Sequence, residues 1–168
     1  LIFRAAFDFN VAHVIFFSCT VMYQTKDQPF LDVPVKETDY DANKEIHPKY
    51  FGVGWTKVYL EKVCEFYSRI GKTKYTVLRH SNIYGPYDKY DLERSHVFGA
   101  TVTKVLTAKD KKLVVWGEGK EERDLLHVDD LVDFVDVAIQ KQQGQFGLYN
   151  VGYGSSVSVR ELVEKVIK

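Results

Sequence analysis

The chain has 168 residues, 45% of them hydrophobic and 27% charged, which is enough for a domain with a sizeable core. Its 23 basic and 23 acidic residues cancel to a formal net charge of zero, so the composition excludes the strong positive field of a protein that gathers nucleic acid or anionic membrane. No apolar run is long enough to cross a bilayer, and we expect no membrane partner.

In chain order, the first predicted elements are the end of a helix at 1–10, a buried strand at 13–18, a helix at 49–71 and a strand at 75–81. A turn at 82–86, a helix at 95–108 and a strand at 112–116 follow. A segment at 124–128 then leads into a helix at 129–142, and a strand is predicted at 148–151. The polar segment 23–48 contains three prolines and is predicted as a long surface connection. A last helix begins at a capping box formed by Ser158 and Glu161. Strands that alternate with helices of this length predict an α/β fold with a parallel sheet covered by helices.

The two cysteines, Cys19 and Cys64, are far apart and lack the spacing of metal ligands. Each lies in an apolar stretch, which favours buried free thiols over a disulfide and hence a reducing, cytoplasmic location. The five histidines are scattered, so we expect no metal site. The chain begins without Met and without a signal-peptide leader, and it stops inside a helix, so we expect a piece of a longer protein cut at both ends.

Lys57 is the first candidate site residue. It lies one turn inside the helix that follows a strand ending in small polar residues, which is the layout of a nicotinamide site. A lysine there can donate to ribose hydroxyls and lower the pKa of a neighbouring phenol, whereas an exposed solubilising lysine is the alternative interpretation. A tyrosine normally stands four residues earlier and reaches the same bound molecule, but this chain has Val53 at that position.

Ser18, Cys19 and Thr20 follow the first predicted strand. Ligands of doubly wound sheets bind outside the carboxyl ends of the strands, where hydroxyl or thiol groups can bond a substrate oxygen. Small residues that merely let the strand end pack are an equally good explanation.

Two further candidates lie later in the chain. His96 begins a predicted helix beyond the turn at 82–86 and could act as a general acid, or it could be an exposed or helix-capping histidine. Arg123 could fork onto phosphate oxygens, while Asp129 and Asp130 are typical of the first turn of a helix.

Together these segments resemble the extended short-chain dehydrogenase/reductase superfamily of NAD-dependent nucleotide-sugar epimerases and dehydratases, with the greatest likeness to GDP-L-fucose synthase. The segments that carry the resemblance are Phe16–Tyr23, Lys57 with Cys64–Tyr67, Asn82–Pro86, Ser95–Val97, Val115–Gly117, Arg123–Asp130 and Tyr149–Gly152. The resemblance implies the C-terminal part of a Rossmann-like doubly wound parallel sheet plus most of a small α/β substrate domain. It assigns 1–90 and 123–144 to the cofactor domain, and 91–122 and 145–168 to the substrate domain.

By the same resemblance, the cofactor is NAD or NADP and the substrate is a nucleotide sugar. Cofactor contacts are implied for Ser18, Cys19, Lys57, Asn82 and Ile83, and substrate contacts for Asn82, His96, Lys104, Trp116 and Arg123. Cys19 takes the place of the catalytic serine or threonine beside Thr20, and His96 that of the acid in epimerisation. Tyr50, seven residues before Lys57, could reach the site in place of the tyrosine that Val53 replaces.

Two functions remain open at this point. The first is an epimerase/reductase acting on a GDP-linked or other nucleotide-linked 4-keto sugar with atypical catalysis, and the alternative is a catalytically silent homologue that acts as a nucleotide-sugar-binding or cofactor-binding partner subunit. The resemblance also implies a homodimer formed through a four-helix bundle, with Tyr59, Phe66 and Tyr67 on its apolar face.

Overall fold

The computed structural model describes residues 1–28, 34–109, 112–115 and 117–168. Its contacts divide the chain into two compact units, each made of two stretches of sequence. The first unit comprises residues 1–81 and 132–151, and the second comprises residues 82–131 and 152–168. Each unit contains its own three-stranded sheet.

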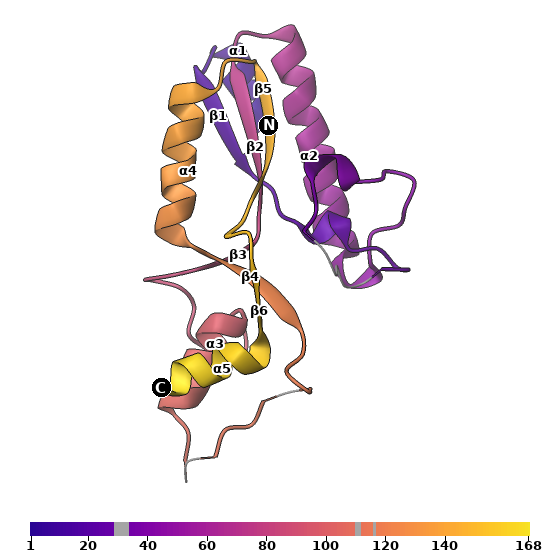
Figure 1. The fold of residues 1–168 in the computed structure, drawn as a ribbon. Helices are drawn as coiled ribbons and strands as arrows, with labels where there is room; N and C mark the ends of the chain where they lie inside the picture. The colour runs from indigo at the N-terminus through magenta and orange to yellow at the C-terminus, as the bar shows by residue number, and fades with distance from the viewer. Residues whose placement is uncertain (29–33, 110–111, 116) are drawn as a thin grey trace. The chain divides into compact units, whose positions relative to one another are not determined.

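The first unit is built on a parallel sheet with the strand order β1-β2-β5 (Figure 1). The strands are β1 (His13–Phe17), β2 (Lys74–His80) and β5 (Phe146–Val151), with β2 in the middle. Five residues of β2 are fully buried in an unbroken run, which is typical of a central parallel strand covered on both faces.

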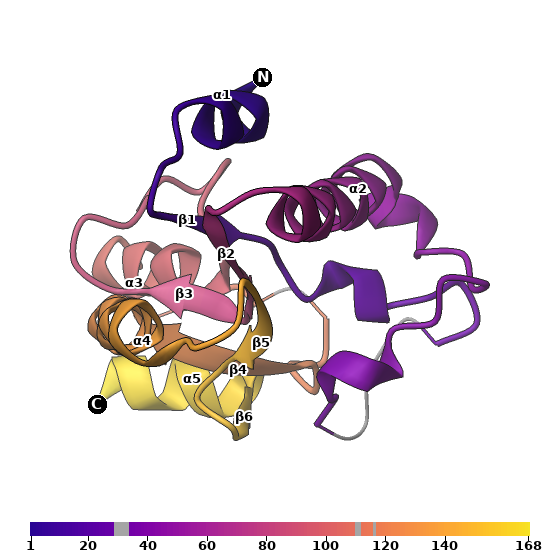
Figure 2. The ribbon, with the colours of Figure 1, turned by 90° about the horizontal axis from the view of Figure 1, so that it is seen from above.

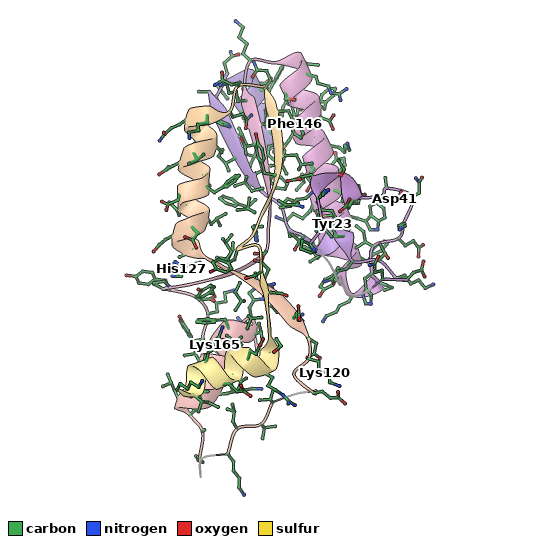
Figure 3. The ribbon with its side chains drawn as sticks, viewed as in Figure 1. Tyr23, Asp41, Lys120, His127, Phe146 and Lys165 are labelled. Atoms are coloured by element: carbon green, nitrogen blue, oxygen red, sulfur yellow. The ribbon has the colours of Figure 1, made fainter. Side chains whose placement is uncertain are left out.

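Helices cover both faces of this sheet, as Figures 1 and 2 show. The helices are α1 (Ile2–Asp8), α2 (Phe51–Ile70) and α4 (Val128–Lys141), of which α4 enters the unit at Val132. Cys64 of α2 packs with Tyr75 and Val77 on one face, while the ring of Phe134 in α4 contacts that of Tyr149 on the other. Alternate side chains of each strand therefore enter two different cores, and Figure 3 shows these side chains between sheet and helices.

Three short 3₁₀ turns lie between β1 and α2: η1 (Val21–Tyr23), η2 (Glu37–Asp39) and η3 (Pro48–Tyr50). The prediction that 23–48 is a surface connection is wrong for Tyr23 and Ile46. Met22, Tyr23 and Ile46 are almost completely buried and form a small core of their own, and Thr25 and Ile46 are joined by a β-bridge.

The second unit contains β3 (Asn82–Tyr84), β4 (Glu122–His127), β6 (Ser156–Ser158), α3 (Val97–Leu106) and α5 (Val159–Ile167). β4 lies in the middle of this sheet, parallel to β3 and antiparallel to β6. The predicted capping box is present at the start of α5, where Ser158 Oγ accepts a hydrogen bond from the amide of Glu161.

Several predicted elements need correction. Residues 82–84 form β3 rather than a turn, because their backbone pairs with β4. The described residues 112–115 are not in a strand, and β6 was not predicted at all. The compact units also differ from the domain ranges that the resemblance implies. Residues 123–131, assigned to the cofactor domain, group with the second unit because β4 pairs with β3 and β6. Residues 145–151, assigned to the substrate domain, group with the first unit because β5 pairs with β2.

Candidate functional site

The carboxyl end of β1 carries the polar residues that the sequence singled out. The amide of Ser18 donates to the carbonyl of Leu78 at 2.8 Å, so hydrogen bonding to β2 continues one residue past the assigned end of the strand. Ser18 itself is completely buried. Cys19 and Thr20 therefore leave the sheet at its carboxyl edge, where ligands of parallel sheets bind.

Lys57 reaches this strand end from the second turn of α2. Its Nζ donates to the carbonyl oxygen of Phe17 at 2.5 Å and lies 4.9 Å from the centre of the Phe16 ring. The side chain thus runs along the sheet instead of extending into solvent. A lysine ammonium has three N–H donors, so the bond to Phe17 leaves donors for the hydroxyls of a ribose.

The Cys19 thiol is half-buried and packs against the Met22–Tyr23–Ile46 core. Burial raises the pKa of the Cys19 thiol above its ordinary value, while a hydrogen bond with the backbone of Val21 and the charge of Lys57 act in the opposite direction. The thiol is therefore protonated at neutral pH and can act as a weak hydrogen-bond donor.

Val53, the position at which the resemblance implies a tyrosine, lies on the first turn of α2 and is 47% exposed. We expected Tyr50 to share a helical face with Lys57, two turns earlier. It does not, because α2 begins at Phe51 and Tyr50 ends the 3₁₀ turn before it. The Tyr50 ring packs against the Met22–Tyr23–Ile46 core, with its centre 6.0 Å from that of the His47 ring.

A buried ion pair that was not predicted from the sequence lies beneath Ser18. Glu61 of α2 and Arg79 of β2 are 5% and 3% exposed, and Arg79 Nη2 lies 2.6 Å from Glu61 Oε2. Burial alone lowers the pKa of the Arg79 guanidinium, but the hydrogen bonds and charge of Glu61 outweigh it and raise that pKa. Arg79 therefore stays charged. The signal in the sequence was a glutamate four residues after Lys57, hence on the same helical face.

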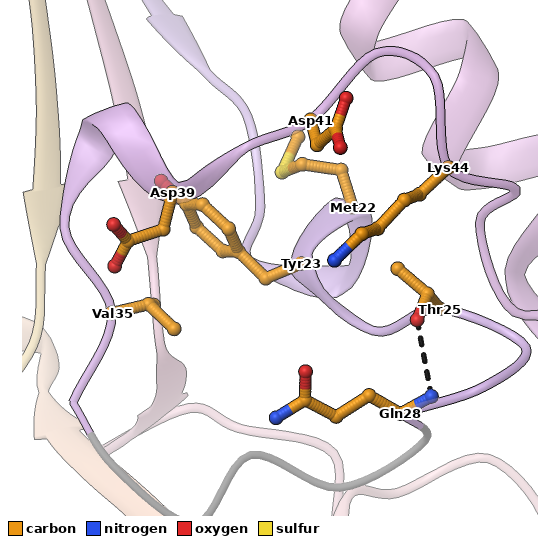
Figure 4. Close-up of a pocket in the computed structure, with 8 residues that line it drawn as sticks. All are labelled: Met22, Tyr23, Thr25, Gln28, Val35, Asp39, Asp41 and Lys44. Atoms are coloured by element: carbon orange, nitrogen blue, oxygen red, sulfur yellow. Dashed lines mark hydrogen bonds between the residues drawn. The ribbon is translucent and has the colours of Figure 1, made fainter.

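Next to this site, the first unit has a pocket of about 200 Å³ (Figure 4). It is lined by Met22, Tyr23, Thr25, Gln28, Val35, Asp39, Asp41 and Lys44. Both carboxylates already accept bonds from the local backbone, Asp39 from Lys36 N and Asp41 from Asn43 N. These bonds account for the acidic residues as turn-forming groups.

The second unit contains the remaining candidates. Asn82 and Ile83 lie on β3 opposite Leu125 and Leu126, and Asn82 Nδ2 donates to the carbonyl of Asp124 at 3.3 Å. β3 thus fixes both residues through its pairing with β4. The Asp124 carboxylate in turn accepts hydrogen bonds from the backbone amides of Tyr153 and Gly154, in the loop between β5 and β6.

The predicted acid and phosphate contacts are also in the second unit. His96 is exposed and is the N-cap residue of α3, which begins one residue later, and its side chain makes no capping hydrogen bond. Lys104 Nζ donates to the carbonyl of Val114 at 3.3 Å, and Arg123 Nη1 to that of Glu122 at 2.7 Å. Trp116 lies outside the described residues.

The described part of the chain also bears on membrane and metal binding. No helix there is long and apolar enough to cross a membrane. Nor does any group of histidine, cysteine, aspartate and glutamate side chains among those residues have the arrangement of a metal site.

Three proteins illustrate what the chain resembles. GDP-L-colitose synthase of Yersinia pseudotuberculosis is 28% identical over 168 residues, which cover 98% of this chain and 53% of the relative. Probable GDP-L-fucose synthase 1 of Oryza sativa subsp. japonica is 42% identical over 89 residues, 51% of this chain and 27% of the relative. The structure of a GDP-D-glycero-L-gluco-heptose synthase from Campylobacter jejuni, determined in the presence of NADPH, matches with a TM-score of 0.80 at 22% identity, covering 99% of this chain and 59% of that one.

The chain thus spans about half the length of GDP-L-colitose synthase. The family model for the NAD dependent epimerase/dehydratase family matches residues 1–152, which is most of the chain. It includes the β1 end with Cys19, the helix with Lys57, and β3 with Asn82 and Ile83. The chain belongs to the NAD dependent epimerase/dehydratase family.

Proposed function

We propose that the whole protein is a nucleotide-sugar epimerase/reductase that acts on a GDP-linked or other nucleotide-linked 4-keto sugar with NAD or NADP. The observation that carries this proposal is the contact between Lys57 Nζ and the carbonyl of Phe17. This contact puts a cation beside Cys19 and Thr20 at the carboxyl edge of a parallel sheet. The names of the relatives, a GDP-L-colitose synthase and GDP-L-fucose synthases, support a GDP-linked sugar.

The residues of this strand end fit the ribose of a nicotinamide cofactor. Lys57 would hold the ribose hydroxyls, and Cys19 and Thr20 would bond the sugar oxygen next to the reacting carbon. The bound cofactor supplies hydride transfer. Asn82 and Ile83 are the further proposed cofactor contacts, whereas Ser18 is completely buried with its hydroxyl bonded to Glu61 and so would support the strand end from within. His96, Lys104, Trp116 and Arg123 are the proposed acid and substrate contacts.

The group that would exchange a proton with the substrate oxygen, in contrast, is missing at Val53. Hydride transfer at a sugar carbinol or ketone requires a partner that takes or gives the proton on oxygen, and a valine side chain cannot do so. Epimerisation next to an existing ketone needs proton removal and return at carbon instead, and this does not involve the Val53 position. We therefore propose that the native protein epimerises keto sugars faster than it reduces them.

Val53 also favours a second function of another kind. A homologue that has lost the acid/base residue but kept Lys57 is suited to binding a cofactor or nucleotide sugar without turnover. Such a protein would be a regulatory or partner subunit. The two functions differ in whether the wild-type protein exchanges substrate protons.

The test uses the full-length protein with a nucleotide-linked 4-keto sugar and NADPH. We expect the wild-type protein to incorporate deuterium from D₂O into the substrate at the carbon next to the ketone, which NMR detects. Its oxidation of NADPH should be slow. Val53→Tyr should increase NADPH oxidation by about a hundredfold or more, the usual contribution of a general acid, whereas Val53→Phe, which lacks the hydroxyl, should not. Binding without exchange in the wild-type protein would establish the silent homologue instead. Wild-type NADPH oxidation as fast as that of Val53→Tyr would show that another residue replaces the tyrosine.

A dimer is the proposed assembly. Tyr59 and Phe66 are exposed on α2, with 67% and 54% of their surface accessible, and are available for a helix pair across a two-fold axis. Tyr67 is not available in the same way, because its ring packs against Phe7 at 5.4 Å between centres.

A further inference from the structure

The ion pair between Glu61 and Arg79 needs an explanation beyond stability. Arg79 engages both carboxylate oxygens: Nε lies 3.1 Å from Oε1 and Nη2 lies 2.6 Å from Oε2. A buried ion pair is weak evidence for stability, because the loss of hydration offsets much of the attraction between the charges. Its hydrogen bonds to other parts of the chain show what else it does.

The first of these bonds holds the start of the segment that carries Cys19. Ser18 Oγ donates to Glu61 Oε1 at 2.5 Å, while Ser18 N donates to the carbonyl of Leu78. A buried hydroxyl bonded to a charged acceptor forms one of the stronger hydrogen bonds in proteins. Ser18 is thereby fixed to α2 through its side chain and to β2 through its backbone.

The second bond holds the end of the same segment. Arg79 Nη1 donates to the Tyr23 hydroxyl at 2.7 Å, and that hydroxyl donates to Asn150 Oδ1 at 2.8 Å. The guanidinium carbon also lies 5.2 Å from the centre of the Tyr23 ring, within cation–π distance. Tyr23 is only 6% exposed, so these contacts are shielded from water.

We propose that the Glu61–Arg79 pair holds both ends of the Ser18–Tyr23 segment, and that Glu61 and Arg79 are positioning residues for Cys19. Lys57 stands one helical turn before Glu61 and bonds the carbonyl of Phe17, so the same face of α2 sets the cation and the segment together. The inference rests on the proposed function, which gives Cys19 and Lys57 their roles.

The test compares three single-hydroxyl variants of the full-length protein. Ser18→Ala removes the first anchor and leaves Glu61 paired with Arg79, and Tyr23→Phe removes the second. Ser68→Ala is the matched control. Ser68 is a buried serine of α2, the helix that carries Glu61, and its hydroxyl donates to the carbonyl of Glu65. The readout is the rate at which iodoacetamide alkylates Cys19, measured by peptide mass spectrometry. Cys64, which is 0% exposed, reports global unfolding in the same samples.

We expect Ser18→Ala and Tyr23→Phe each to raise the Cys19 rate by about ten- to hundredfold, the factor by which losing one hydrogen bond to a charged group shifts a local opening equilibrium. Cys64 should stay unreactive, and Ser68→Ala should leave the Cys19 rate within about twofold of wild type. If Ser18→Ala does not fold, Tyr23→Phe decides the question alone.

Equal Cys19 rates in all three variants would overturn the inference. A joint rise of the Cys19 and Cys64 alkylation rates would overturn it too, because the Glu61–Arg79 pair would then stabilise the fold as a whole and not this segment. The alkylation result does not depend on turnover. Absence of both turnover and cofactor binding in wild type would refute the proposed function and leave the anchoring of the segment intact.

Discussion

At the residue scale, the proposed chemistry depends on which groups near Lys57 can give or take a proton. The Cys19 thiol and the Thr20 hydroxyl stand at the end of β1, while the exposed Val53 offers no such group. A half-buried thiol whose pKa is raised keeps its proton at neutral pH. Cys19 is therefore suited to donate a hydrogen bond and poorly suited to act as a nucleophile.

The pH dependence of Cys19 alkylation tests this description. Because the thiolate is the reactive form and burial raises the pKa of Cys19, the alkylation rate should reach half its maximum at a higher pH than for a free cysteine. Lys57→Met removes a charge that lowers this pKa, so it should move the midpoint further up. A midpoint at or below that of a free cysteine, or a downward shift in Lys57→Met, would contradict the assignment.

At the residue level, the predicted position of Ser18, Cys19 and Thr20 after a strand is confirmed, and Lys57 lies beside that strand end, while the roles of these residues stay predictions. The Glu61–Arg79–Tyr23–Asn150 network was missed because its partners are 18, 56 and 127 residues apart in the chain. Such partners are brought together by sheet pairing, which spacing within one segment does not reveal.

The element that organises the site is α2. Lys57, Glu61, Cys64 and Ser68 repeat at helical spacing along the face toward the sheet, and the last three are buried. Tyr59, Phe66 and Ile70 lie on exposed positions of the same helix. One helix thus presents a mainly polar stripe to the core and exposed aromatic residues, beside charged ones such as Lys62 and Arg69, to the outside.

Cys64 gives this inner stripe a measurable pH response. Burial raises the pKa of Cys64 to about 12, whereas the thiol ionises near 9.0 once exposed. Since the folded state binds the proton more tightly, Cys64 contributes stability below pH 9 that is lost as the pH rises toward 12. Between pH 8 and 10 this contribution should fall by about 1 kcal/mol. Denaturant unfolding should show the loss in wild-type protein and a correspondingly smaller loss in Cys64→Ala. Equal losses in both proteins would place the pH response elsewhere.

The long elements were predicted well, and so was the five-residue β1, whereas the two three-residue strands were not. The predicted helix at 49–71 and the strand at 75–81 agree with α2 and β2 to within a few residues, because each repeats its pattern several times. β3 and β6 have three residues each, too few for a period to show. Their pairing with β4 defines them.

At the scale of the whole molecule, the two compact units are interleaved in sequence. The chain leaves the first unit after Ser81, returns at Val132, and leaves again after Val151. These positions follow the strand pairing, because β5 pairs with β2 in the first unit and β4 pairs with β3 and β6 in the second. The exposed aromatic residues of α2 belong to the first unit and carry the proposed dimer contact.

Charge substitutions test that dimer. Tyr59→Glu combined with Phe66→Glu should raise the dimer dissociation constant of the full-length protein by at least about a hundredfold, because burying two unpaired carboxylates costs several kcal/mol. Ile139→Glu, at a half-exposed apolar position of α4, is the matched control and should leave the constant unchanged. Analytical ultracentrifugation gives both values. A wild-type monomer, or equal weakening by the control, would contradict the α2 interface.

Lys57 is proposed to anchor a nicotinamide cofactor at the end of β1, and a binding measurement tests this role directly. Isothermal titration of NADH and NADPH into full-length wild-type protein, Lys57→Met and Lys62→Met separates this lysine from an exposed lysine of the same helix. We predict binding of at least one dinucleotide to wild type and to Lys62→Met, with affinity lowered about ten- to hundredfold in Lys57→Met, the effect of losing charge-assisted hydrogen bonds. Absence of dinucleotide binding to wild type, or unchanged affinity in Lys57→Met, would contradict the claim.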